Sequence, residues 1–187
     1  MPRTRKPTTN TPFGEAKLQL SGVTAPDYWT DILKLLFPKN TTRQNLARVL
    51  LEELKAAKEN REVITTSDWI RIVIRALKED SVYGELGEFI EKMWKELEEQ
   101  GVTRPEQVKI LTREANEFQA KQIPNKELPP GFGHYRGAWY PTLRTLTKAG
   151  MIRQDGTRLE LSTAFASKLE RIAKLWRKFA GGSEEVW

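Results

Sequence analysis

The chain has 187 residues, of which 39% are hydrophobic, so it is long and apolar enough to bury a core. It contains no cysteine, which excludes disulfides, thiolate nucleophiles and metal sites that depend on sulfur, and we expect an intracellular, cytoplasmic protein. No apolar run reaches the length that crosses a bilayer, and residues 1–12 lack the apolar stretch of a signal peptide, so we expect no membrane association.

The formal net charge of +6 is distributed unevenly along the chain. Residues 1–10 carry +3, residues 11–133 carry −2, residues 134–180 carry +7 and residues 181–187 carry −2. Positive charge concentrated in one segment is typical of a protein that binds a polyanion such as nucleic acid. A solvated basic helix on an ordinary protein would give the same pattern, so both interpretations stay open on charge alone.

Residues 1–12 are polar and contain three prolines, so they cannot bury enough surface to fold, and we expect a disordered basic arm. Its three cations, Arg3, Arg5 and Lys6, could contact a DNA minor groove, although a disordered terminus without such contacts is the simpler interpretation. After the arm, residues 16–20 alternate apolar and polar side chains, which predicts a short strand.

Residues 13–101 are predicted to form a helical N-terminal region. Apolar side chains recur at three- and four-residue spacing over residues 26–37, 41–60, 67–78 and 84–100, and each stretch is predicted to be a helix. The third of these stretches is apolar almost all round. We therefore expect it to lie at the centre of the N-terminal core.

Residues 102–182 are predicted to form a second domain, followed by a tail over residues 183–187. A capping threonine and a proline in the first turn predict a helix over residues 104–121. The next segment, residues 123–137, is so rich in proline and glycine that we expect a loop or a series of turns.

The segment after this loop predicts a compact helical module. A short helix over residues 138–149 ends at Gly150, and an Asp-Gly pair between two alternating segments then predicts a two-stranded hairpin. A last helix follows, with an apolar seam formed by Phe165, Leu169, Ile172, Leu175 or Trp176, and Phe179. The fold class expected is mainly α, with a helical N-terminal region and a C-terminal winged helix-turn-helix that has a small two-stranded wing.

The helix over residues 138–149 has the composition of a DNA-reading helix. One side is apolar, and the other sides carry arginine, lysine and threonine, which contact phosphates, guanine edges and thymine methyl groups. The side chains that we expect to contact DNA from this helix and the wing are Arg136, Tyr140, Thr142, Arg144, Thr145, Lys148, Arg153, Thr157 and Arg158.

The stretch GAWYPTLRTLTKAGMI resembles the recognition-helix signature of PadR-type winged-helix transcriptional regulators, and RLELSTAFASKLERI is similar to their second wing strand and the helix after it. The resemblance covers about a quarter of the chain. It implies DNA binding by the helix and wing, and dimerisation through helices that flank the module. The positions that match the signature are Gly137, Tyr140, Pro141, Leu143, Leu146, Gly150 and Ile152.

The chain lacks the common signatures of catalytic sites. His134 is the only histidine, and no phosphate-binding loop, serine-hydrolase elbow or zinc-protease motif occurs. The glutamates of residues 84–100 alternate with lysines, as they do on solvated helix faces. We therefore expect a protein that is not an enzyme and that uses no cofactor or metal.

These observations together predict a sequence-specific double-stranded DNA-binding protein, acting as a transcriptional regulator. One short helix reads few base pairs, so we expect a homodimer, with the N-terminal helical region around Trp69 and Trp94 as the place for pairing or for a protein partner. The alternative is a non-enzymatic interaction or assembly subunit of a replication, partition or nucleic-acid-processing complex, whose winged helix docks on protein.

Overall fold

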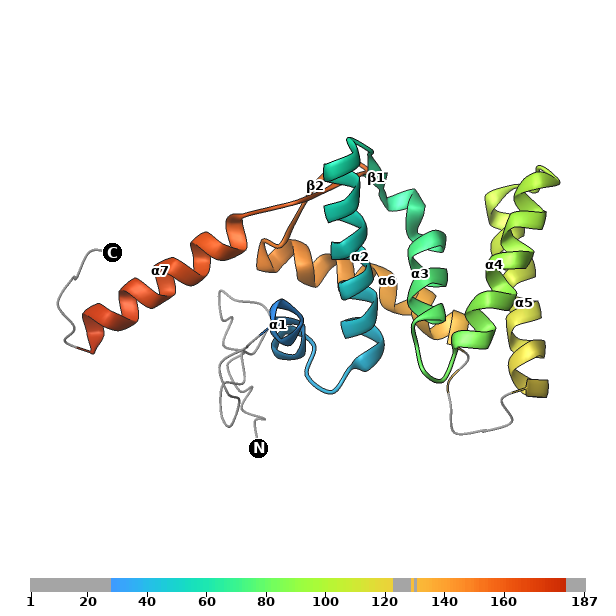
Figure 1. Cartoon of the computed structure of the whole chain (residues 1–187), viewed down its shortest axis with the longest axis horizontal. Coiled ribbons are helices and arrows are strands. Elements are labelled where there is room, and N and C mark those ends of the chain that lie inside the picture. Colours follow the sequence, from blue (N-terminus) through green and yellow to red (C-terminus); the bar gives the residue numbers. More distant parts are fainter. Residues whose placement is uncertain (1–27, 123–128, 130, 181–187) are drawn as a thin grey trace, which may run out of the picture.

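The computed structural model describes residues 28–122, 129 and 131–180 (Figure 1). The prediction of a mainly helical protein is confirmed, with one small antiparallel sheet among the residues described. The predicted arm at residues 1–12, strand at 16–20 and tail at 183–187 lie outside the described part. The elements are α1 (Trp29–Leu36), α2 (Thr41–Asn60), β1 (Ile64–Thr65), a 3-10 turn (Thr66–Asp68), α3 (Trp69–Lys78), α4 (Gly84–Glu99), α5 (Arg104–Gln122), α6 (Gly131–Ala149), β2 (Ile152–Asp155), β3 (Arg158–Leu161) and α7 (Ala164–Phe179).

The start of α6 differs from the sequence prediction. The helix begins at Gly131, so the loop predicted for residues 123–137 is wrong over its last seven positions. Phe132 and Tyr135 are buried and continue the apolar side of the helix by about two further turns. Burial of two large aromatic side chains outweighs the cost of about 1 kcal/mol for each glycine in a helix.

The core is formed by α2, α3 and α6 together with the sheet. One continuous cluster of buried side chains runs from Leu33 to Leu159, across residues 101 and 102, where the sequence predicted a boundary. The strand order is β1-β3-β2, so the predicted two-stranded hairpin carries a third strand. In β1, Ile64 pairs with Leu159 of β3. A strand of two residues is too short to give a periodic signal in the sequence.

Two further helices, α4 and α5, connect α3 to α6 and form an antiparallel pair at one end of the molecule (Figure 1). Phe89 of α4 stacks on Phe118 of α5 with their ring centroids 4.5 Å apart. Gly87 lets α4 approach α3, because a Cβ atom there would lie 2.5 Å from the backbone nitrogen of Lys78. The two helices therefore pack on each other, and α4 packs closely against α3 of the core.

Helix α7 leaves the body of the molecule and projects away from it (Figure 1). Among the described residues, its hydrogen bonds to the body come from its first turn: the Phe165 amide donates to the Gly150 carbonyl at 2.9 Å, and Lys168 Nζ donates to the Lys148 carbonyl at 2.9 Å. No residue of α7 is buried. Most of the apolar seam predicted for this helix is thus exposed, to 51% at Ile172 and 82% at Phe179.

Candidate nucleic-acid interface

One side of α6, called the basic face below, carries a row of three basic side chains and one aromatic side chain. Arg136, Tyr140, Arg144 and Lys148 follow one another at four-residue intervals, and all four are exposed. Residues four apart are neighbours on a helix surface, and over twelve residues, at 3.6 residues per turn and 1.5 Å per residue, the row rises about 18 Å and winds about a third of a turn around the helix. Since α6 contains no Asp or Glu, no acid of the same helix offsets these charges. The structure therefore brings together four of the predicted site residues.

The opposite face of α6 is fixed in the core. The Tyr135 hydroxyl donates to the Asp80 carboxylate at 2.6 Å and accepts from Asn45 Nδ2 at 3.0 Å. Burial, with the nearby Asp80 carboxylate, raises the pKa of Tyr135 far above its ordinary value, so the hydroxyl keeps its proton. These two hydrogen bonds tie α6 to α2 and to the turn after α3. The buried side chains of this face are Phe132, Tyr135, Trp139, Leu143 and Leu146.

A single arginine from α2 holds the middle of α6. Arg43 Nη2 donates to the Pro141 carbonyl at 2.8 Å and to Thr145 Oγ1 at 2.7 Å, and its Nε donates to Thr142 Oγ1 at 3.4 Å. The guanidinium also lies 4.6 Å from the centroid of the Phe37 ring. Sequence reasoning missed Arg43, because its partners lie about a hundred positions further along the chain and no local pattern connects them.

These contacts involve two of the residues predicted to contact DNA, and they overturn the prediction for one of them. Thr142 has no exposed surface, so its predicted role at the DNA is wrong; it was placed on an outer face because only one buried side of α6 was expected. Packing of α2 buries a second side. Thr145 is half-buried, and its hydroxyl donates to the Pro141 carbonyl at 3.0 Å while accepting from Arg43. Its hydroxyl is thus already engaged within the protein.

The hairpin of β2 and β3 contributes less positive charge than expected. Arg153 and Arg158 are exposed, but both pair with Glu160, at 2.6 and 2.8 Å. Together with Asp155, these residues give the hairpin a net charge of zero. Arg153 faces Glu160 across the two strands, a register that the Asp-Gly turn itself sets. The remaining predicted residue, Thr157, is exposed in the turn.

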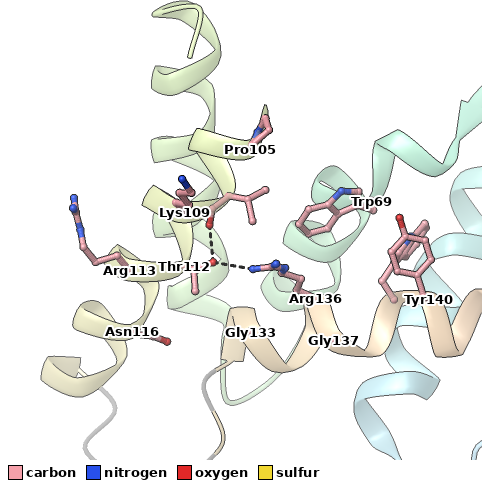
Figure 2. Close-up of a pocket in the computed structure, with 12 residues that line it drawn as sticks. Trp69, Pro105, Lys109, Thr112, Arg113, Asn116, Gly133, Arg136, Gly137 and Tyr140 are labelled. Atoms are coloured by element: carbon pink, nitrogen blue, oxygen red, sulfur yellow. Dashed lines mark hydrogen bonds between the residues drawn. The ribbon is translucent and has the colours of Figure 1, made fainter. Parts of the chain in front are cut away.

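A groove lies between α5 and α6 at the N-terminal half of the basic face (Figure 2). Its volume is about 1060 Å³. A second, smaller hollow of about 290 Å³ is lined in part by Gln154 of β2, and Tyr140 lines both the groove and this hollow. Sequence reasoning missed two basic lining residues, Lys109 and Arg113, because α5 has a mixed charge pattern. The groove is lined by Trp69, Pro105, Val108, Lys109, Thr112, Arg113, Asn116, Gly133, Arg136, Gly137, Trp139 and Tyr140.

Two other kinds of site are absent from the described residues. No group of three or more His, Asp or Glu side chains there could hold a metal ion, and no helix there is both long and apolar enough to span a membrane. The predicted arm contacts Arg3, Arg5 and Lys6 lie outside the described ranges.

Comparison of the chain with protein-family models, with curated proteins and with solved structures finds no match. The resemblance to PadR-type regulators therefore stays a prediction.

Proposed function

We propose that the chain binds double-stranded DNA as a winged helix-turn-helix protein. In this proposal α3 and α6 take the places of the two helices, α6 enters the major groove, and the β2–β3 hairpin is the wing. The succession α2, β1, α3, α6, β2 and β3, with the strand order β1-β3-β2, supports the assignment. The α4–α5 pair is then an insertion between the two helices of the motif.

The observation that carries the proposal is the basic face of α6, which contains no acidic residue. Arg144 and Lys148 are exposed next to a hollow that Gln154 of β2 also lines. An α-helix with its side chains is about 10–12 Å wide, which fits a major groove of about 12 Å. There, arginine reaches guanine edges or phosphates and lysine reaches phosphates. Because the hairpin is neutral, the wing adds no net charge to the attraction that the basic side chains of α6 provide.

Replacement of both Arg144 and Lys148 by alanine tests this role. We expect weaker binding to a 20-base-pair duplex, and a slope of log K against log salt that is smaller by about 2, as for the loss of two phosphate contacts. A matched control removes two exposed lysines of α2, Lys55 and Lys58, and should leave the slope unchanged. A folded double variant with wild-type affinity at every salt concentration would refute the proposal.

We further propose that two copies pair through α7, rather than through the N-terminal helices. Apolar side chains recur along α7 at alternating spacings of four and three residues, as in a coiled-coil seam. The positions beside the seam are mostly small or apolar, whereas five charged residues fall on the outer positions. Charges there point away from the partner helix, so the like charges of two paired copies do not face each other. The seam is Phe165, Leu169, Ile172, Trp176 and Phe179, and the outer charges are Glu170, Arg171, Lys174, Arg177 and Lys178.

The mass in solution tests the pairing. Light scattering should give two chains for the wild type and one chain for Ile172→Asp, with Lys174→Asp as a control that changes charge on the outer side of α7. Both positions are exposed, so neither change disturbs the core. A wild-type protein with the mass of one chain at micromolar concentration would exclude the homodimer.

The exposed seam of α7 also favours the second candidate function, an assembly subunit that docks on another protein. The two functions differ in what they bind. Selection of bound sites from a random DNA pool should enrich a palindromic sequence if the chain is a dimeric transcriptional regulator. An assembly subunit without DNA contacts would enrich no sequence and would show no binding to duplex DNA at low salt.

A further inference from the structure

The groove between α5 and α6 has an excess of positive charge over its whole lining. None of its lining residues is acidic. Lys109 and Arg136 are exposed, and over the described ranges neither forms an ion pair; the one contact of Arg136 with the opposite wall is a long hydrogen bond of 3.5 Å to Thr112. Arg113 is offset by Glu114, 2.7 Å away. Lys109 and Arg136, on opposite walls of the groove, are thus available to bind an anion.

The same groove exposes aromatic surface. Trp69 and Tyr140 lie on the α6 side of the groove, with Arg136 between them and α5 (Figure 2). Trp69 is held in place by Phe132, with their ring centroids 6.4 Å apart, and Tyr140 is 65% exposed. Aromatic faces beside cations are what an unpaired nucleotide requires, since its base stacks while its phosphate is neutralised.

A glycine in the wall of the groove has no packing role. Glycine lowers the stability of a helix interior, so its presence there calls for a reason. At Gly131, the first residue of α6, packing is the reason, because a Cβ atom would lie 2.6 Å from the Tyr83 ring. At Gly137 a Cβ atom would meet nothing within 4 Å. In addition, Pro141 has no N–H to donate to the Gly137 carbonyl. Gly137 therefore keeps the helix backbone accessible from the groove.

We propose that this groove binds an unpaired nucleic-acid strand that continues from a duplex held on the basic face of α6. Phosphates of the strand contact Lys109 and Arg136, and its bases stack on Tyr140 and Trp69. The proposal rests on the proposed function for the position of the duplex. A free nucleotide has the same chemistry, but continuity favours the strand, since Tyr140 lines both the groove and the hollow beside Arg144 and Lys148.

Fluorescence anisotropy with two DNAs tests the proposal: a blunt 16-base-pair duplex, and the same duplex with an eight-thymidine overhang. We expect the overhang to raise wild-type affinity about tenfold, the effect of one stacked base. Gly137→Leu, which fills the groove, and Lys109→Gln should abolish this advantage while changing the affinity for blunt duplex less than twofold. Lys121→Gln, an equal loss of charge at an exposed position of α5 outside the groove, should retain it.

Equal binding of the two DNAs by the wild type would overturn the proposal, as would an undiminished advantage in Gly137→Leu. Competition by thymidine monophosphate as effective as that by an eight-thymidine strand would overturn the assignment to a strand. Binding of the overhang DNA with no binding of the blunt duplex would support the groove and refute the proposed duplex contact. Circular dichroism and thermal unfolding establish that each variant is folded.

Discussion

Replacing Arg43 by alanine removes the hydrogen bonds that join α2 to the middle of α6. Two short hydrogen bonds from a charged donor are lost, to the Pro141 carbonyl and the Thr145 hydroxyl. The buried Thr142 hydroxyl loses its longer contact, and Phe37 loses the stacked guanidinium. A hydrogen bond to a charged group contributes about 1.5–3 kcal/mol in protein interiors, and a cation–π contact about 0.5–1 kcal/mol at exposed sites.

Arg43 is only half-buried, so water replaces part of what is lost, and we expect a net decrease of about 2–3 kcal/mol in the free energy of unfolding. For a chain of this size this lowers Tm by roughly 5–10 °C. Urea and thermal unfolding measure both quantities. Arg43→Lys should recover little, because an ammonium cannot reproduce the fork of the guanidinium.

Lys55→Ala, at an exposed position of the same helix, is the control and should change the free energy of unfolding by less than about 0.5 kcal/mol. An Arg43→Ala variant as stable as this control would refute the idea that Arg43 secures α6.

Three other substitutions have outcomes that follow from the geometry. Tyr135→Phe should lower the free energy of unfolding by about 1–3 kcal/mol, because the buried Asp80 bond is lost. The pKa of Tyr135 is raised in the folded state. The stability that its hydroxyl provides is therefore complete below the ordinary pKa of 10.0 and is lost as the pH rises above that value. In urea titrations between pH 9 and 11, the free energy of unfolding should fall more steeply for the wild type than for Tyr135→Phe. Gly131→Ala should destabilise the protein by about 1–3 kcal/mol through the clash with Tyr83, whereas Gly137→Ala should stabilise it by about 0.5–1 kcal/mol. Thermal unfolding measures both variants, and changes in Tm of the same sign would contradict this reasoning.

The elements that the sequence predicted well are those whose signal is local. Helices α2, α4 and α5 each contain several turns of apolar periodicity between clear end signals, so their bounds came within two residues of the structure. The basic face of α6 was also predictable, since Arg144 and Lys148 lie off the apolar side of a short amphipathic helix.

The elements that were missed depend on residues distant in sequence. Tyr135 extends α6 only because α2 and the turn after α3 cover it, and the local glycines indicated a loop. Thr142 was misplaced for the same reason, since Arg43 of α2 contacts it. The groove beside Lys109 needs α5 and α6 side by side, an arrangement that no periodicity reveals.

The pairing of β1 with β3 has a consequence for how the protein folds. Ile64 and Leu159 are neighbours in the sheet but about 95 residues apart in the chain. Such contacts raise the contact order, and the entropy of closing so long a loop slows their formation. During synthesis α2 and α3 leave the ribosome without α6 and β3, with much of their apolar surface uncovered. The basic face is therefore assembled only after nearly the whole described chain has emerged, and a fragment limited to residues 131–180 should not fold.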